Sequence, residues 1–313
     1  MRGVEPLARE VERIATDSGA VVGFGFLHLE SGRRLILNEG ERFPMASTYK
    51  IAMACRLLRL VEEGAYTLGQ MVDIDQDELS PGGGLVKAHI YHPGLSLSVH
   101  NLINLAMTVS DNTSTDKMLE LAGGPQEVTG FLRATGIEGM RIDRSTKLLI
   151  TDAYGVTDDM PDGQWSYRFL QEHEEEVFKK APPDAPADAY RTDPRDTTTP
   201  EAMVRLLERL VRGELLSAEG TRALLEIMER CESGEHRLRG LLPPGVAVTH
   251  KTGTIPRVCI NDAGILALPD GGGAIVAVFV KALSAADYIG DAESERVIAQ
   301  IARSTYDYAV FAC

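Results

Sequence analysis

The sequence predicts an α/β fold of the α+β type, in which both ends of the chain contribute strands to one antiparallel sheet. Two observations lead to this prediction. Strand-like segments occur near the termini, at 21–38 and 246–280, and the chain between them has the apolar spacing of amphipathic helices. Because strands and helices that are segregated along a chain favour an antiparallel sheet covered by helices, we expect flanking terminal helices and an inserted all-helical subdomain.

The N-terminal end supplies a helix and two strands. Apolar residues recur every three or four positions from Val4 to Ile14, which is the spacing of a helix with one buried face. The dipeptide Ser31-Gly32 then separates two apolar runs, as in a hairpin. The expected boundaries are 4–19 for the helix and 21–30 and 33–38 for the strands.

The central part of the chain is expected to be almost wholly helical. The expected helices span 48–63, 99–109, 113–121, 125–135, 200–212 and 218–229. The segment from Asp152 to Arg195 does not follow this pattern, and the proline-rich stretch 181–186 within it is expected to be a loop.

The C-terminal end mirrors the N-terminal end. Strands are expected at 246–252, 263–268 and 274–280, with a turn at 269–272 and a closing helix at 293–310. We therefore expect 1–43 and 246–313 to form a sheet subdomain and 44–245 to form a helical subdomain, with an atypical insertion at about 147–194.

Composition and charge narrow the classes of function. The 313 residues include 46 acidic and 32 basic ones, which gives a net charge of −14. Binding to nucleic acid or to an anionic membrane is not expected, because phosphate groups are bound by local excesses of Lys and Arg. No apolar run is long enough to insert into a membrane, and no signal peptide follows Met1. The four cysteines and the pair His89 and His92 lack metal-site spacing, so we expect no metal and no cofactor.

A serine and a lysine lie three residues apart in Ser47-Thr48-Tyr49-Lys50, at the predicted start of a helix. The helix dipole at that end favours a developing negative charge on the Ser47 oxygen. Lys50 projects from the same face, and burial would depress its pKa so that it acts as a base. The alternative is a capping serine followed by a solvated lysine, which is a common combination.

The second motif is Ser110-Asp111-Asn112, between two predicted helices. Its functional interpretation makes Ser110 a proton relay to a leaving group and Asn112 a contact for a substrate amide. The alternative is helix capping, since all three residue types are preferred caps.

The third motif is Lys251-Thr252-Gly253-Thr254, at a predicted strand end. Lys251 would supply positive potential for a substrate carboxylate, and Gly253 would let a substrate backbone approach the strand. The N–H of Thr254 would pair with that of Ser47 as an oxyanion hole. The alternative is a lysine and a turn at a strand end. Taken together, the three motifs favour acyl transfer through a covalent ester on Ser47.

In the content and order of these motifs the chain resembles the class A serine β-lactamases, within the penicillin-recognising serine hydrolases. The likeness covers nearly the full length and extends to 122–125, 195–200, 213–216, 236–239 and 261–264. It implies a β-lactamase/transpeptidase-like fold and a serine hydrolase that cleaves the β-lactam amide through an acyl-Ser47 intermediate.

The resemblance also implies roles for single residues. Ser47 is the expected nucleophile, Lys50 its general base or relay, and Ser110 the group that passes a proton to the leaving nitrogen. The expected substrate-binding residues are Asn112 for the acyl-amide side chain, Lys251 and Thr252 for the carboxylate, and Thr254 beside them. Arg237 matches an arginine that some members use as an extra carboxylate anchor; the equal alternative is a surface arginine in a charged stretch.

The chain departs from the family pattern after Arg144. Family members place a glutamate two residues later, which activates the water that hydrolyses the acyl-enzyme. Here Thr146 falls at that position, although Arg144 and Asp196 fit the two ends of the loop and are expected to form a salt bridge. Deacylation is therefore expected either to be impaired or to use a non-standard base. The carboxylates available are Asp152, Asp158, Asp159, Glu172 and Glu174.

Three functions remain open from the sequence. The first is a β-lactamase-like hydrolase, the second a related peptidase or esterase with little β-lactamase activity, and the third a penicillin-binding sensor that does not turn over. We expect a monomer that acts on a small-molecule substrate carrying a carboxylate. The resemblance implies a periplasmic or secreted protein, while a cytoplasmic location remains open.

Overall fold

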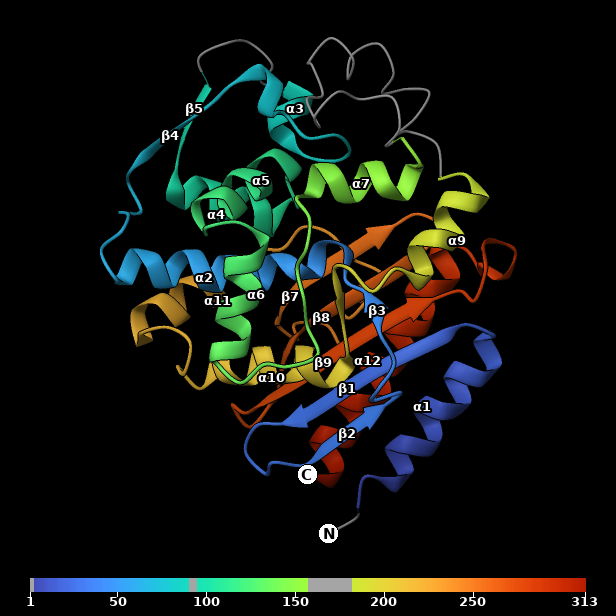
Figure 1. Cartoon of the computed structure of the whole chain (residues 1–313). Coiled ribbons are helices and arrows are strands. Elements are labelled where there is room, and N and C mark those ends of the chain that lie inside the picture. The colour runs from blue at the N-terminus through green and yellow to red at the C-terminus, as the bar shows by residue number, and fades with distance from the viewer. Residues whose placement is uncertain (1–2, 90–94, 157–181) are drawn as a thin grey trace.

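The computed structural model describes residues 3–89, 95–156 and 182–313 (Figure 1). Its main antiparallel sheet has the strand order β2-β1-β9-β8-β7. Both chain ends supply strands, so the α+β prediction is confirmed. The bounds are β1 Val21–His28, β2 Arg34–Leu37, β7 Val248–Ile255, β8 Cys259–Ala267 and β9 Gly273–Lys281.

Helices cover both faces of this sheet. The terminal helices α1 (Glu5–Ser18) and α12 (Asp291–Ala312) pack side by side on one face, as predicted. Helix α10 (Pro200–Val211) lies on the other face. A Cβ at Gly25 would lie 2.5 Å from a methyl group of Val204, so α10 packs on β1 more closely than a side chain at that position would allow.

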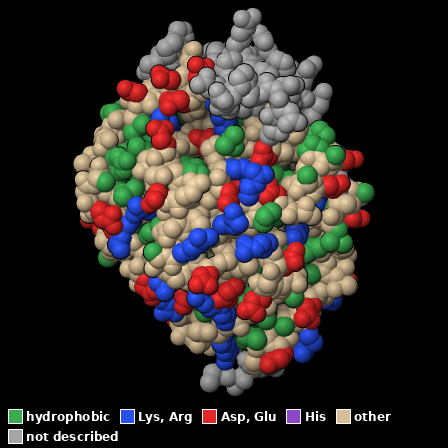
Figure 2. Space-filling view, viewed as in Figure 1, with side chains coloured by type: hydrophobic (Ala, Val, Ile, Leu, Met, Phe, Trp, Pro, Cys, Tyr) green, Lys and Arg blue, Asp and Glu red, His purple; other side chains and the backbone are tan. Residues whose placement is uncertain are grey.

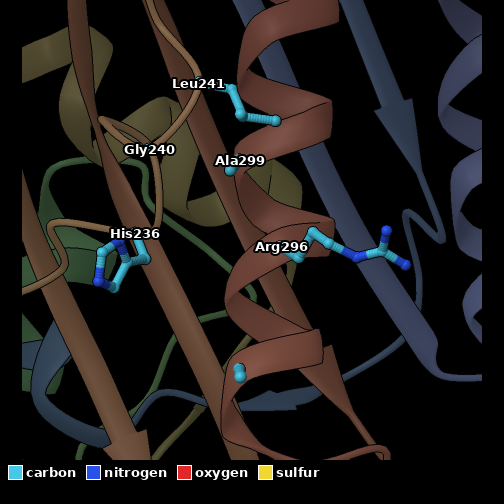
Figure 3. Close-up of a pocket in the computed structure, with 6 residues that line it drawn as sticks. His236, Gly240, Leu241, Arg296 and Ala299 are labelled. Atoms are coloured by element: carbon cyan, nitrogen blue, oxygen red, sulfur yellow. The ribbon is translucent and has the colours of Figure 1, made fainter.

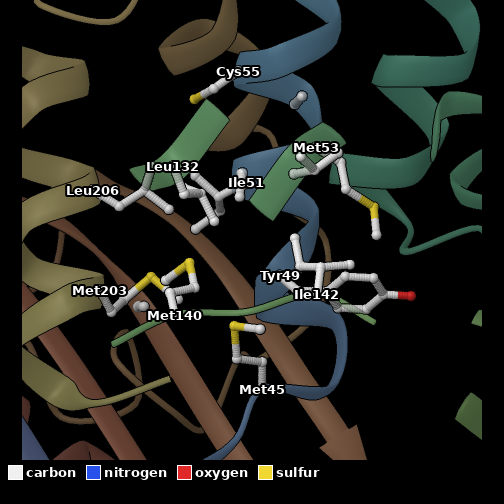
Figure 4. Close-up of a cluster of buried hydrophobic side chains, with 14 of the residues drawn as sticks. Met45, Tyr49, Ile51, Met53, Cys55, Leu132, Met140, Ile142, Met203 and Leu206 are labelled. Atoms are coloured by element: carbon white, nitrogen blue, oxygen red, sulfur yellow. The ribbon is translucent and has the colours of Figure 1, made fainter. Parts of the chain in front are cut away.

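The remaining helices form the upper part of the molecule in Figure 1, around α2 (Lys50–Glu62). The others are α3 Leu85–His89, α4 Val99–Thr108, α5 Asn112–Leu121, α6 Pro125–Ala134, α7 Thr146–Tyr154, α9 Asp184–Thr192 and α11 Ala218–Glu229. Most residues of α2 are buried, and their side chains meet those of neighbouring elements in a core rich in methionine (Figure 4). Within the described ranges, no helix is both long and apolar enough to cross a bilayer.

Several details differ from the sequence-based expectation. Two short ribbons were not predicted: β3 (Phe43–Pro44) pairs with β6 (Thr197–Thr198), and β4 (Met71–Ile74) pairs with β5 (Leu95–Ser98). The expected loop at 181–186 is wrong from Asp184 onward, where α9 begins. Prolines at its start do not prevent a helix, because the first turn needs no intrahelical N–H donors.

The base of the long loop is held by a buried arginine. Arg144 donates through Nε to Asp196, 52 positions later, at 2.5 Å, which confirms the expected salt bridge. Its Nη1 also contacts Asp152 at 2.5 Å and Asp193 at 3.1 Å. The guanidinium lies over the ring of Tyr190, 5.0 Å from its centroid. Three carboxylates and a ring thus surround one cation.

Charges on the surface are mostly interleaved. Lys and Arg side chains group near the middle of the face in Figure 2, with acidic side chains around them. Arg13 on α1, for example, contacts both Glu10 and Asp17. Such exposed pairs contribute at most about 1 kcal/mol each to stability, so burial rather than surface charge determines the fold.

Candidate active site

The predicted nucleophile lies on a short turn that leads into α2. Ala46–Tyr49 is a 3-10 turn, and Lys50 begins the α-helix without a break. Ala46 has a left-handed φ of 46°, which is unfavourable for a residue with a side chain. Ser47 is partly exposed, whereas the residues on either side of it, Ala46 and Thr48, are buried. The turn therefore presents one hydroxyl-bearing residue to the outside.

Lys50 is fully buried, so the alternative of a solvated lysine is wrong. Its Nζ donates to the carbonyl oxygen of Ser110 at 2.8 Å, to the hydroxyl of Ser110 at 3.1 Å and to Oδ1 of Asn112 at 3.1 Å. The amine is thus hydrogen-bonded by neutral groups.

The hydroxyl of Ser110 connects two lysines. Lys251 Nζ donates to it at 3.1 Å, the same distance as from Lys50 Nζ. Ser110 has a left-handed φ of 58°, a second strained non-glycine residue at this site. Because β7 carries Lys251 and α2 carries Lys50, the hydroxyl lies where the sheet and the helices meet.

Burial changes the proton affinity of both amines. Desolvation, together with the charge of Lys251, holds the pKa of Lys50 well below its usual value. Desolvation also lowers the pKa of Lys251 to about 8. The lowered pKa makes Lys50 a better candidate for a proton acceptor than an ordinary lysine, and a pKa of about 8 leaves Lys251 mostly charged at neutral pH.

The Ser110-Asp111-Asn112 motif combines capping with site contacts. Asp111 accepts from Ser114 N–H at 2.7 Å and caps α5, so the capping interpretation is confirmed for this residue. Its second oxygen accepts from Val86 N–H at 2.8 Å. The Asn112 amide donates to the carbonyl oxygen of Pro81 at 2.9 Å. The motif thus also fixes the 79–86 segment beside the site.

The Lys251-Thr252-Gly253-Thr254 motif lies inside β7, not at a strand end, because the strand continues to Ile255. The structure adds a second reason for Gly253, beside the predicted approach of a substrate. A Cβ there would lie 2.5 Å from the carbonyl oxygen of Met45. The glycine is needed for the protein's own Ser47 turn to pack against β7, and it thereby brings Ser47 and Thr254 onto adjacent backbones.

Arg237 is buried, with 7% of its surface exposed, so the surface-arginine alternative is wrong. It donates to the carbonyl oxygens of Gly253 at 3.1 Å and Asn261 at 3.0 Å, and to the Thr254 hydroxyl at 2.7 Å. Its Nε pairs with Glu295 at 3.0 Å. The arginine therefore places positive charge directly behind exposed Thr254.

The hydroxyl of Thr252 faces the segment after α11. It lies 2.5 Å from the hydroxyl of Ser233, and the Sγ of buried Cys231 lies 3.5 Å from the same serine. Thr252 itself is buried. The hydroxyl groups of Thr252 and Ser233 and the thiol of Cys231 thus contact one another in series, beside the carboxylate-binding residues expected on β7.

At the position expected for a catalytic glutamate, the structure places a pair of hydroxyls. The Thr146 hydroxyl lies 2.5 Å from that of Tyr49, and both residues are buried. Burial raises the pKa of Tyr49 well above its usual value, so the phenol stays neutral. Asp116 accepts from the backbone N–H of Thr146 at 2.6 Å and from the hydroxyl of Ser80 at 2.6 Å.

The carboxylates considered as substitutes for this glutamate do not supply one among the described residues. Asp152 pairs with Arg144, and also with Arg195 at 3.2 Å, at the base of the long loop. The other four, Asp158, Asp159, Glu172 and Glu174, lie outside the described residues.

A pocket of about 190 Å³ opens beside the predicted site residues. Asn112 on α5 and Thr254 on β7 are its polar lining residues. Its other walls come from the 82–83 glycines, from α7 and from the end of β7, as Gly82, Gly83, Ile150, Ala153, Tyr154, Ile255 and Pro256. One side is thus polar and the other apolar, which suits a small amphipathic ligand.

Another pocket, of about 180 Å³, lies between the 236–241 segment and α12 (Figure 3). Its lining includes His236, but Arg296 on α12 points away from that histidine. None of the predicted site residues lines it. In the described part of the chain, no group of three or more metal-ligating side chains is found.

Sequence reasoning missed four buried or partly buried residues at or next to this site. Tyr49 and Asp116 meet Thr146, while His250 and Asp262 form a fully buried pair at 2.8 Å beside Lys251. The available signal was a polar residue within an apolar run, as in Val248-Thr249-His250, since a buried polar group needs a partner.

Known proteins resemble this chain over almost its full length. The model of the β-lactamase enzyme family matches residues 6–309. The chain is similar to the extended-spectrum β-lactamase PER-1 of Pseudomonas aeruginosa, with 28% identity over 97% of this chain and 87% of the relative.

Two solved structures show the same fold. A β-lactamase from Chitinophaga pinensis has 28% identity and a TM-score of 0.78, over 97% of this chain and 99% of that one. An ancestral class A β-lactamase has 29% identity and a TM-score of 0.75, over 96% and 99%. The chain therefore belongs to the β-lactamase enzyme family of serine hydrolases and has the class A fold.

Proposed function

We propose that this protein opens the β-lactam amide by acyl transfer to Ser47. The observation that carries the proposal is the hydrogen-bonded series Lys50–Ser110–Lys251 beside the Ser47 turn. A serine nucleophile needs an adjacent base, and a leaving nitrogen needs a proton donor. Buried Lys50, whose pKa is lowered, supplies the base, and the Ser110 hydroxyl beside it supplies the proton donor.

The acylation step follows from these groups. The Ser47 oxygen attacks the lactam carbonyl carbon while its proton passes to neutral Lys50. The backbone N–H groups of Ser47 and Thr254 hold the oxyanion of the tetrahedral intermediate. When the carbon–nitrogen bond breaks, Ser110 donates its proton to the nitrogen and regains one from Lys50. The ester on Ser47 and the free amine are the products of this step.

The substrate carboxylate is bound from the β7 side. Lys251 and Thr252 contact it, and Arg237 adds positive potential through Thr254. Asn112 binds the amide of the acyl side chain, whose apolar part lies against the α7 wall of the 190 Å³ pocket. Charged Lys251 and Arg237 favour an anionic over a neutral substrate of the same size.

Hydrolysis of the ester is the slow step in this proposal. A base must activate the water that attacks the acyl carbon, and relatives use a glutamate where this chain has Thr146. Its hydroxyl pairs with that of Tyr49 and carries no charge. This contact supports a second candidate function, a penicillin-binding protein that stays acylated; turnover of small acyl esters remains the third.

Mass spectrometry after addition of benzylpenicillin tests the proposal. Wild type should gain one penicillin mass, and Ser47→Ala should gain none; a label on the Ser47→Ala protein would contradict the assignment. The lifetime of the adduct then distinguishes the candidates. Loss within seconds indicates a β-lactamase, and persistence over hours indicates a binding protein.

A comparison of two substrates separates the esterase candidate. Steady-state turnover of a chromogenic cephalosporin is measured beside that of a p-nitrophenyl ester. Faster ester turnover, with a penicillin adduct that does not form, would favour the peptidase or esterase.

A further inference from the structure

A pocket of about 320 Å³ opens on the surface where α6 ends and β3 begins. Its lining combines three arginines with one acidic and two uncharged residues, namely Arg42, Arg133, Arg141, Glu138, Gly139 and Met140. The pocket beside the predicted active-site residues shares none of them. Because acidic residues outnumber basic ones by 46 to 32 in this chain, three arginines around one pocket run against the overall charge.

Two of these three arginines lack an ionic partner. The ion pairs found in the described part of the chain engage Arg141, through Asp143 at 2.5 Å, but neither Arg42 nor Arg133, and they do not engage Glu138 either. Even with Asp143 assigned to Arg141, the remaining lining carries two positive charges against one negative charge. An anion in the pocket would therefore meet a local excess of positive charge.

The fold holds these arginines in a fixed arrangement. Thr197 on β6 accepts from Arg42 Nη1 through its hydroxyl at 3.3 Å, and from the Arg141 N–H through its carbonyl oxygen at 3.0 Å. Arg133 lies in the last turn of α6, and Thr129 of that helix is hydrogen-bonded to the backbone next to Arg141 at 2.8 and 2.9 Å. Three segments of the chain thus bring arginines to one pocket, and a ligand does not have to assemble them.

The side chains and the size of the pocket indicate the chemical class of its ligand. A guanidinium presents parallel N–H donors that match two oxygens of a phosphate group. A tetrahedral dianion can contact Arg42, Arg133 and Arg141 through different oxygens. The Glu138 carboxylate would repel a second phosphate group, but it can accept a hydrogen bond from a hydroxyl. The pocket therefore suits a single phosphate group with a small hydroxylated substituent, and its volume is within the range of small-molecule sites.

We propose that this pocket binds the phosphate group of a small phosphate monoester, which Arg42, Arg133 and Arg141 hold together. The ligand joins the end of α6 to β3, the strand that leads directly into the Ser47 turn. Because it binds the folded chain, it stabilises the fold. Free phosphate has the same chemistry and is the other possible source of the group. The site is separate from Ser47, so the proposal does not depend on acyl transfer.

Isothermal titration calorimetry tests the site with inorganic phosphate and with glycerol 3-phosphate, at an ionic strength kept constant with sodium chloride. Both probes should bind near pH 7.5, where they are mostly dianions, and more weakly near pH 5, where they carry one negative charge. At ten times its dissociation constant, each probe should raise the Tm by about 2–4 °C. Tighter binding of glycerol 3-phosphate supports an ester as the ligand, and equal binding supports free phosphate at the same site.

Matched variants assign the binding to this pocket. Arg42→Gln and Arg133→Gln should each raise the dissociation constant at least about tenfold, because each removes a hydrogen bond between charged groups. Arg9→Gln, at an exposed arginine on α1, changes the net charge equally and should leave the dissociation constant unchanged. Glu138→Gln should lower it, since this substitution removes the one carboxylate of the lining.

Absence of binding for both probes up to about 10 mM, ten times a millimolar dissociation constant, would overturn the proposal. So would an unchanged dissociation constant in Arg133→Gln, or an equal rise in Tm with sodium chloride alone. Arg133→Gln decides the matter if Arg42→Gln does not fold, because Arg42 also contacts Thr197. Ser47→Ala should bind both probes as wild type does, so a failure of the proposed acylation would leave this test unaffected.

Discussion

Two neighbouring regions of the active site are equipped differently for chemistry. Around Lys50, buried amines, a hydroxyl and an amide contact one another, and the pKa values of the amines are lowered. Around Thr146, the contacts join neutral hydroxyls, and Asp116 is occupied by backbone N–H groups and Ser80. The comparison teaches that the groups suited to forming an acyl-enzyme and those suited to hydrolysing it belong to separate parts of the fold.

The largest effect is expected for Lys50→Met, which removes the proposed base from the better equipped region. The acylation rate with benzylpenicillin should fall by about 10²–10⁴, the usual contribution of a positioned base. Stopped-flow or quenched-flow mass spectrometry measures it. Lys147→Met on α7, whose Nζ donates to the carbonyl oxygen of Asp77 at 2.8 Å, is the control and should stay near wild type. Similar acylation rates for both variants would mean that the groups around Lys50 are not specially suited to forming the acyl-enzyme.

Arg144→Met should destabilise the fold at the foot of the long loop, in the region that carries Thr146. It leaves Asp196, Asp193 and Asp152 without their shared cation, and breaking such a buried pair costs about 3–5 kcal/mol. The free energy of unfolding is measured by urea titration. Arg195→Met at the exposed neighbouring position should cost less than about 1 kcal/mol. Equal costs would mean that the cluster is not a structural centre.

Thr146→Glu in a Tyr49→Phe background should give the region around Thr146 a group that can act as a base, as the region around Lys50 already has. The new carboxylate can act as a base toward water, so the hydrolysis rate of the penicillin adduct should rise at least about tenfold. Decay of the adduct mass reports this rate. Thr146→Gln in the same background has the same size without the charge and should show no gain. A gain with glutamine would show that the removed hydroxyl pair, and not a missing base, limits hydrolysis.

A smaller effect is expected from pH on the acylation rate. Protonation of Lys50 below its lowered pKa removes the base, so the rate should rise with pH there. Loss of the proton from Lys251 above about 8 removes the carboxylate anchor, so the rate should fall again. Lys251→Arg should abolish the fall, because arginine stays charged. A fall near pH 8 that persists in that variant would assign it to another group.

Much of the fold was predictable because it depends on local patterns. The apolar spacing of α1, α10 and α12 and the turn before β9 are encoded in contiguous segments. The strand β8 begins at Cys259, earlier than predicted, since Asn261 and Asp262 interrupt its apolar run. The Asn261 amide nitrogen donates to the carbonyl oxygens of Pro44 and Met45, and Asp262 pairs with His250. These partners lie on other strands and turns, which no local pattern contains.

The site residues divide in the same way, into those that a local motif identifies and those whose contacts arise only from the tertiary fold. Ser47, Lys50, Ser110 and Lys251 were identified by short motifs, and the structure brings the last three into direct contact. Tyr49 and Thr146 are 97 positions apart and meet only through the tertiary fold. The burial of Arg237 was likewise hidden by its charged neighbours in the sequence, because Glu235 and His236 are exposed while Arg237 turns inward.

The contact between Gly253 and the Met45 carbonyl has a consequence for how this enzyme can change over evolution. With 2.5 Å available, any side chain at position 253 would push apart the turn that carries Ser47 and the strand that carries Lys251. Thr254, the next residue, is exposed and free of that restriction. Substitutions that alter substrate preference can therefore occur at position 254 and at the pocket rim, whereas a substitution at position 253 would disrupt the site itself.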